Sequence, residues 1–255
     1  MITDYLRFRW KSVNAHGLHS PFMYHLATRC FYDKTKYPDY QKLKLYHHEL
    51  IRNKQIIEVE DLGAGSRKFK SQYRKISAIA QISGSNINDM KRYYRLVRYF
   101  KPDNILELGT SLGKATYAMA LGNPNANIIT VEGAEQLAHI SEKLLKNKNI
   151  KAKIINQNFD DYLKQLNLTE IKFDFILIDG NHRLQPTLTY FEKLQKHIHN
   201  DTVVIIDDIY WSNEMKHAWQ QLIKHPNVRQ SVDTFHFGML FFRKEQFKQD
   251  FIIRY

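Results

Sequence analysis

Two glycines and a glutamate surround the end of a short apolar segment in the middle of the chain. The segment Ile105–Leu108 runs into Gly109, and Gly113 precedes the next helical pattern. Glycines in a strand-to-helix turn let the backbone approach a ligand closely. A dinucleotide site would need the spacing G-x-G-x-x-G and would not place a carboxylate, here Glu107, beside a pyrophosphate. The loop therefore favours a ligand with a positively charged group over a dinucleotide.

A second acid, Glu132, ends the next apolar segment, Asn127–Val131. An acid at this place in an α/β fold can accept hydrogen bonds from the ribose hydroxyls of a nucleoside. A nucleoside that also carries a cationic group is S-adenosylmethionine, which we predict as the cofactor. Asn158 and Phe159 follow the third segment, where they can either hold the adenine or only begin a helix. The predicted cofactor-binding residues are Glu107, Gly109, Thr110, Ser111, Gly113, Glu132, Asn158, Phe159 and Asp179.

Three acids follow the fourth and fifth apolar segments. Asp179 comes after Phe173–Ile178, and Asp207 and Asp208 come after Val203–Ile206. Ligands of an open α/β sheet bind beyond the carboxyl ends of its strands, so we expect these carboxylates to converge. Oxygen ligands favour Mg²⁺, Ca²⁺ or Mn²⁺. We predict a divalent-metal site at these three residues, with helix capping as the alternative. His182 is the predicted proton acceptor, and Asp179 is the second predicted catalytic residue.

Short apolar segments alternate with amphipathic ones from residue 104 to residue 206, which predicts parallel strands covered by helices. Two adjacent β-rich runs, Val228–Phe235 and Phe237–Phe242, can pair only antiparallel. The predicted fold is α/β and Rossmann-like: a mostly parallel seven-stranded sheet with a C-terminal antiparallel hairpin, preceded by a mainly helical basic N-terminal segment. This is the architecture of class I methyltransferases. The five expected parallel strands are Asn104–Glu107, Asn127–Val131, Lys153–Asn156, Phe173–Ile178 and Val203–Ile206.

Residues 90–242 resemble the catechol O-methyltransferase and caffeoyl-CoA O-methyltransferase type of enzyme. The resemblance is carried by ILELGTSLGKATYAMA and TVEGAEQLAHI, and by the acids after the fourth and fifth strands. It implies methyl transfer to an oxygen and Mg²⁺ ligation at Asp179, Asp207 and Asp208. The sequence departs from the family pattern at Asp208, where the family has Asn, and at His182, where it has a catalytic Lys.

Positive charge is concentrated in the first part of the chain. Residues 1–100 carry 19 Lys/Arg and 8 Asp/Glu, whereas residues 101–255 carry 19 and 18. Such a surface attracts an acidic small molecule, a nucleic acid or an anionic membrane, or only keeps the protein soluble. We predict an accessory segment over residues 1–90 that covers the acceptor pocket, and a cofactor-binding domain over residues 91–255. The segment Asn14–Tyr24 is interpreted as either a lid or a packed loop, and the glycine-containing Asp61–Ser66 as a loop that does not bind cofactor.

Composition excludes several classes of protein. A hydrophobic fraction of 43% is too high for a disordered chain. The single cysteine, Cys30, cannot form an intramolecular disulfide, and no apolar run reaches the ~20 residues of a membrane span. The N-terminus lacks the apolar core of a signal peptide, so we expect a cytoplasmic protein. The histidine pairs His16/His19 and His197/His199 are interpreted as surface or packing residues.

The sequence thus predicts an S-adenosylmethionine-dependent methyltransferase that modifies an oxygen of a small, acidic acceptor. Two alternatives stay open: an RNA methyltransferase that uses the basic N-terminal segment, and a cofactor-binding partner subunit without catalysis. Strand four ends in IDGNH, not in the Asn/Asp-Pro-Pro-aromatic segment expected for methylation of adenine amines. Whether the chain forms a homodimer also stays open.

Overall fold

The computed structural model describes residues 2–60, 71–82 and 85–255. The chain forms two compact units. One is continuous and spans residues 34–165, and the other combines residues 1–33 with residues 166–255. Neither unit begins at residue 91. The predicted accessory segment (residues 1–90) and cofactor-binding domain (residues 91–255) stay predictions. The loop Asp61–Ser66 lies outside the described residues.

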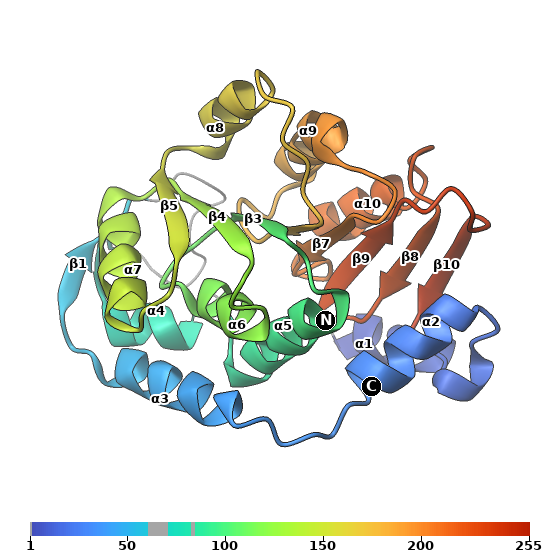
Figure 1. Ribbon diagram of the computed structural model, residues 1–255, viewed down its shortest axis with the longest axis horizontal. Coiled ribbons are helices and arrows are strands. Elements are labelled where there is room, and N and C mark those ends of the chain that lie inside the picture. The colour runs from blue at the N-terminus through green and yellow to red at the C-terminus, as the bar shows by residue number, and fades with distance from the viewer. Residues whose placement is uncertain (1, 61–70, 83–84) are drawn as a thin grey trace. The chain divides into compact units, whose positions relative to one another are not determined.

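Three parallel strands form the centre of the continuous unit, in the order β3-β4-β5 (Figure 1). They are β3 (Asn104–Leu108), β4 (Asn127–Glu132) and β5 (Ala152–Asn156). Leu108 pairs with Val131, and Glu132 pairs with Asn156, so the carboxyl ends of the three strands lie at one edge. The connecting helices are α6 (Lys114–Gly122), α7 (Glu135–Asn147) and α8 (Phe159–Leu166).

Helices and one small hairpin complete this unit. Helix α5 (Ile87–Phe100) begins at a capping box made by Asn86 and Asp89, which satisfies backbone N–H groups that a helix start leaves unpaired. The predicted extended segment near residue 56 is strand β1 (Ile56–Glu58), which pairs antiparallel with β2 (Tyr73–Lys75). The other helices are α3 (Asp39–Arg52) and α4 (Ile76–Ile82).

The second unit contains five strands in the order β10-β8-β9-β7-β6. Strands β6 (Phe175–Ile178) and β7 (Val203–Asp207) are parallel, as predicted. Strands β8 (Gln230–Asp233) and β9 (Phe237–Phe241) form the predicted antiparallel hairpin, and β9 also pairs antiparallel with β7. Strand β10 (Gln249–Ile252), parallel to β8, is an addition to the predicted strands. Helices α9 (Leu184–Leu194) and α10 (Asn213–Leu222) connect the strands.

Residues 2–33 pack against the last strands of the chain. Helices α1 (Ile2–Lys11) and α2 (Pro21–Leu26) lie beside β8–β10 in Figure 1, and a π-helix at Ala27–Phe31 follows them. Val13 forms a parallel bridge with Ile253. The predicted helical character of the N-terminal segment is confirmed for these residues. The segment Asn14–Tyr24 contains a 3₁₀ turn at Ala15–Gly17 and the start of α2, capped by Ser20. In the described parts of the chain no helix is both long and apolar enough to cross a bilayer.

Candidate functional site

The loop after β3 adopts a backbone conformation that favours glycine. Gly109 has a φ of 112°, Ser111 of 48° and Gly113 of 67°. A Cβ at Gly113 would come within 3.1 Å of the side chain of Leu145, which adds a steric reason for glycine there. Gly113 thus makes room for the packing of Leu145 from α7, and α6 begins directly after the loop.

Glu107 lies beneath this loop and is fully buried. Its Oε2 accepts hydrogen bonds from the hydroxyls of Thr116 and Thr130. Its Oε1 is buried and, within the described residues, has no hydrogen-bond partner. Burial raises the pKa of Glu107 to about 7, although the two threonine hydroxyls act in the opposite direction. Oε1 of Glu107 can therefore still accept a hydrogen bond from a ligand. A cation beside this carboxyl group would favour its ionised form.

Glu132 connects the loop after β3 to the end of β4. Its Oε2 accepts from the backbone N–H of Ser111 at 2.8 Å, and its Oε1 accepts from that of Ala134 at 3.0 Å. Burial raises the pKa of Glu132, and these N–H groups oppose the shift. A carboxylate has about four acceptor positions, so each oxygen can still accept a further hydrogen bond.

Two predicted cofactor residues have side chains that already serve the fold. The hydroxyl of Thr110 is buried and lies 2.6 Å from that of Thr130. Asn158 precedes α8, where its Oδ1 accepts from the backbone N–H of Asp161 and its Nδ2 donates to the Asp161 carboxylate. This is the helix-start role that the sequence left open. Phe159 is the first residue of α8 and is half-buried.

The predicted catalytic residues lie in the second unit, after β6 and β7. Nε2 of His182 is 3.7 Å from Oδ1 of Asp179, and the His182 ring lies 6.3 Å from the ring of Trp211. Burial lowers the pKa of His182, and the negative charge of Asp208 opposes this shift. The structure therefore brings Asp179, His182 and Asp208 into one neighbourhood.

Backbone turns set the directions of these side chains. Asn181 and Asp208 both have positive φ, of 52° and 53°. Nδ2 of Asn181 donates to the Tyr190 hydroxyl at 3.0 Å, while its Oδ1 is buried with no partner in the described part of the chain. Asp208 accepts at its carbonyl from the N–H of Trp211 at 2.8 Å, so it opens a turn. Asp207 remains the last residue of β7, opposite Phe237.

The predicted metal ligands do not form a recognisable metal site. Across residues 2–60, 71–82 and 85–255, no three side chains of His, Cys, Asp or Glu are arranged to hold a metal ion. The oxygen donors of Asp179, Asp207 and Asp208 suit Mg²⁺ chemically. Their arrangement, however, does not fit a bound ion, so we derive no chemistry from a metal.

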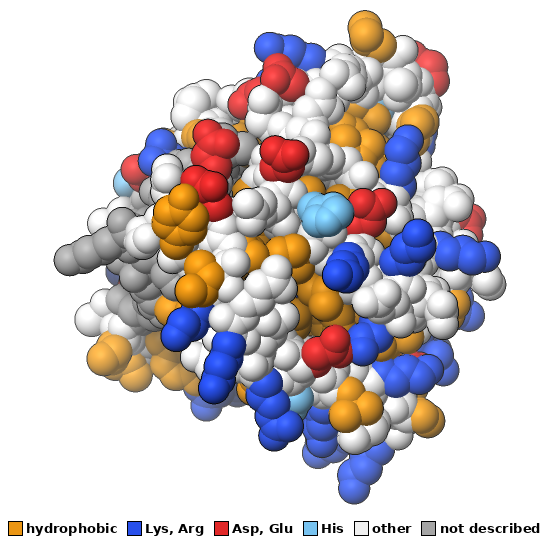
Figure 2. Space-filling model, turned by 90° about the vertical axis from the view of Figure 1, so that its left-hand side faces the viewer, with side chains coloured by type: hydrophobic (Ala, Val, Ile, Leu, Met, Phe, Trp, Pro, Cys, Tyr) orange, Lys and Arg blue, Asp and Glu red, His pale blue; other side chains and the backbone are white. Residues whose placement is uncertain are grey.

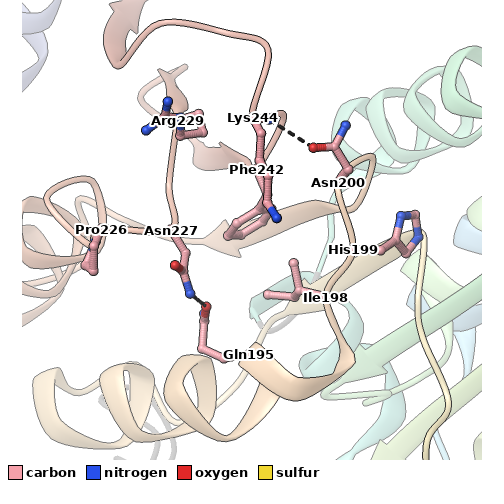
Figure 3. Close-up of a pocket in the computed structure, with 9 residues that line it drawn as sticks. All are labelled: Gln195, Ile198, His199, Asn200, Pro226, Asn227, Arg229, Phe242 and Lys244. Atoms are coloured by element: carbon pink, nitrogen blue, oxygen red, sulfur yellow. Dashed lines mark hydrogen bonds between the residues drawn. The ribbon is translucent and has the colours of Figure 1, made fainter.

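The described residues also line a cavity of about 810 Å³ in the second unit (Figure 3). It lies near the start of β7, since Asn200 and Phe242 flank the pair Val203–Phe241, whereas Asp207 ends the strand. Asn200 accepts from the backbone of Lys244 and donates to Glu245, and Asn227 donates to Gln195. None of the predicted site residues lines this cavity.

The chain is similar to known methyltransferases in sequence pattern and in fold. Residues 106–209 match a family model described as a methyltransferase domain. The chain is similar to the SAH-bound Podospora anserina methyltransferase PaMTH1, with a TM-score of 0.61, 15% identity, and coverage of 89% of this chain and 97% of that one. The fold is that of a class I methyltransferase.

Two further structures share this methyltransferase fold. The O-methyltransferase from Bacillus cereus in complex with SAH has a TM-score of 0.56 and 19% identity, and covers 86% of this chain and 94% of that one. The O-methyltransferase TomG from Streptomyces achromogenes in complex with SAM has a TM-score of 0.58 and 16% identity, with coverage of 82% and 91%. No curated protein sequence matches the chain significantly.

In each unit, residues that the sequence did not single out contact the predicted ones. Thr116 and Thr130 hold Glu107, Trp211 lies beside His182, and Asn181 turns the chain between Asp179 and His182. Thr130 carries a recognisable signal, because it is a polar residue in the otherwise apolar interior of a buried strand. Trp211 carries none, since its proximity to His182 depends on how two loops fold.

Proposed function

We propose that the protein is an S-adenosylmethionine-dependent methyltransferase that methylates an oxygen of a small acceptor. The observation that carries this proposal is the buried Glu107 beneath the Gly109–Gly113 loop. A buried carboxylate oxygen without a hydrogen bond is costly, and a positively charged group beside it would remove that cost. When bound, S-adenosylmethionine supplies an electrophilic methyl group.

Glu107 and Glu132 have different roles in this proposal. Glu107 offers its unpartnered Oε1 to the cationic end of the cofactor. Glu132 accepts from the ribose hydroxyls while it holds the N–H of Ser111, so it also fixes the loop against which the cofactor binds. Gly109 and Gly113 allow the positive φ angles that this loop needs, and Gly109 carries no side chain that could block the cofactor. Known structures with this fold in complex with SAH or SAM support the cofactor.

His182 is the proposed proton acceptor for the hydroxyl of the acceptor. An imidazole can take a proton that leaves an oxygen as the methyl group arrives. The carboxylate of Asp179, 3.7 Å from Nε2, would stabilise the imidazolium that forms. The proposal uses no metal ion, because the three acids are not arranged around one.

An acidic small acceptor is favoured over a nucleic acid by the distribution of charge. Lys and Arg side chains are numerous on the face shown in Figure 2, and the Asp and Glu side chains that accompany them lie mostly in its upper half. Binding to nucleic acid depends on a continuous basic surface that neutralises successive phosphates. A small anion needs only a few cations around one pocket.

Calorimetry with SAM, SAH and NAD tests the cofactor assignment. We expect binding of the first two and none of NAD. NAD binding without a response to SAH would overturn the proposal. Release of SAH in the presence of hydroxylated small molecules then separates an enzyme from a cofactor-binding subunit. Turnover with RNA alone would support the nucleic-acid alternative.

A further inference from the structure

Helix α1 carries apolar side chains on the side that faces solvent. Ile2, Leu6 and Trp10 are 79%, 62% and 85% exposed. Their spacing of four residues places them in one row along the helix, because successive residues of an α-helix turn by about 100°. Together they expose roughly 450 Å² of apolar surface, within the range of the largest patches on soluble proteins, which are often functional. We call these three residues the α1 stripe.

The opposite side of α1 is already packed on its own unit. Phe8 is buried, and its ring lies 5.4 Å from that of Phe235, which also contacts Tyr5 at 5.1 Å. Asp4 accepts a hydrogen bond from Lys216 at 2.9 Å. Phe8 lies about 160° around the helix from Leu6, at 100° per residue. The α1 stripe therefore cannot be part of the same core, and α1 has two apolar sides with only one covered.

Positive charges flank the α1 stripe. Arg7 and Arg9 lie on its two sides and Lys11 follows it, and all three are exposed. None of them forms an ion pair with any residue that the structure describes. The only acid on the helix is Asp4, which Lys216 already neutralises. The α1 stripe is therefore suited to a surface whose outer groups are negatively charged and whose interior is apolar. Its apolar side chains can enter the interior, and Arg7, Arg9 and Lys11 can contact the negative groups.

We propose that α1 docks the protein on an anionic lipid surface through the α1 stripe. Helices that lie in a membrane interface have this combination of an apolar row, a bulky aromatic residue and flanking Arg or Lys. The bilayer needs only one side of the helix, which is all that α1 offers. Each basic residue near an anionic bilayer adds about 1 kcal/mol, roughly a five-fold gain in binding.

A second copy of the chain fits the α1 stripe less well. A stable protein interface buries about 800 Å² on each partner, well above the roughly 450 Å² of the stripe. Pairing of two α1 helices would also bring Arg7 and Arg9 of both copies together without a free acid between them, and like charges at close range repel. Docking on an anionic lipid surface does not need the larger buried area of a protein interface. It also brings the arginines close to negative charges and not to one another.

The test is co-sedimentation of the full chain with phosphatidylcholine vesicles that contain or lack phosphatidylglycerol. We expect binding to the anionic vesicles that falls as salt rises, and little binding to the neutral ones. The double variant Leu6→Ser with Trp10→Ser should bind at least ten-fold more weakly. The matched control, Leu168→Ser with Phe247→Ser, removes two side chains that are 87% and 89% exposed elsewhere, and should bind like the unmodified protein.

Light scattering of the same proteins without vesicles tests the alternative that a second copy of the chain covers the α1 stripe. A dimer that dissociates in the Leu6→Ser and Trp10→Ser variant, with no vesicle binding by the unmodified protein, would overturn the proposal in favour of a second copy. Equal vesicle binding by both double variants would overturn it as well. Thermal unfolding of the variants should be unchanged, since the replaced side chains are exposed, and this separates lost docking from lost folding.

Discussion

The hydroxyl of Thr130 donates a hydrogen bond of 2.6 Å to the buried carboxylate of Glu107, from strand β4 to strand β3. Because the Thr130 proton is then used, its oxygen accepts from the hydroxyl of Thr110, also at 2.6 Å. Thr110 belongs to the loop proposed to bind cofactor. The ionisation of a buried acid is thus connected, through two hydroxyl groups, to the first residues of that loop.

Replacing Glu107 by Gln should stabilise the fold at alkaline pH and weaken cofactor binding. Burial raises the pKa of Glu107 from 4.5 to about 7, so the folded state holds this proton more tightly than the unfolded state. Stability from this group is then present below about pH 4.5 and is lost as pH rises to about 7, by roughly 3 kcal/mol. Urea unfolding at pH 5 and pH 8 measures it. The variant should lose this part of the pH dependence, and an unchanged slope would contradict the assignment.

Replacing Glu132 by Ala should weaken SAH binding by roughly 1.5–3 kcal/mol, the cost of a lost charged hydrogen-bond pair. The variant loses the proposed acceptor for the ribose and also releases the N–H of Ser111. Calorimetry with SAH measures the effect. Glu135→Ala is the matched control, because Glu135 is an exposed acid three residues away in α7. Equal affinities for the two variants would show that another acid holds the ribose.

Replacing His182 by Gln should lower kcat by about 10²–10⁴-fold and leave SAH affinity unchanged. Gln keeps a polar side chain of similar size but cannot accept and then release a proton. Single-turnover kinetics, once an acceptor is found, measures the chemical step directly. A variant with full activity would remove His182 from the reaction.

Removing divalent metal ions should leave activity unchanged. The structure gathers no three metal-ligating side chains within its described residues, so a chelator has no assembled site to empty. Activity measured with EDTA, and again after excess Mg²⁺, checks this. A loss in EDTA that Mg²⁺ restores would show that Asp179, Asp207 and Asp208 assemble around an ion when ligands bind, as the sequence predicts.

The sequence predicts the central strands and the loop after β3 well, because these depend on local patterns. Continuous apolar runs can only be buried strands here, and Gly109 and Gly113 are required by backbone conformations that other residues adopt rarely. Glu107 lies at the end of the buried strand, as predicted, but its complete burial could not be read from the sequence. Its burial depends on Thr116 and Thr130, which come from two other elements.

Long-range pairings could not be predicted. Strand β10 contains only Phe251 and Ile252 as apolar residues, too few to predict a strand from alternation. Its formation depends on parallel pairing with β8, and Val13 continues the same edge through Ile253. No local signal in residues 1–33 indicates that they pack on the last strands of the chain. The sequence gives no sign that residues 1–33 and 34–90 fall into different compact units.

The bridge between Val13 and Ile253 has a consequence for synthesis of the protein. The unit of residues 34–165 is continuous, so its internal contacts become available as soon as those residues leave the ribosome, whereas residues 1–33 must wait for residues 166–255. During that interval Phe8 and Tyr5 have no Phe235 to pack on. Before residues 166–255 are made, helix α1 therefore exposes both the apolar side chains that later pack on Phe235 and those of the α1 stripe. Nascent chains stalled before residue 230 should therefore be the form that chaperones bind most strongly.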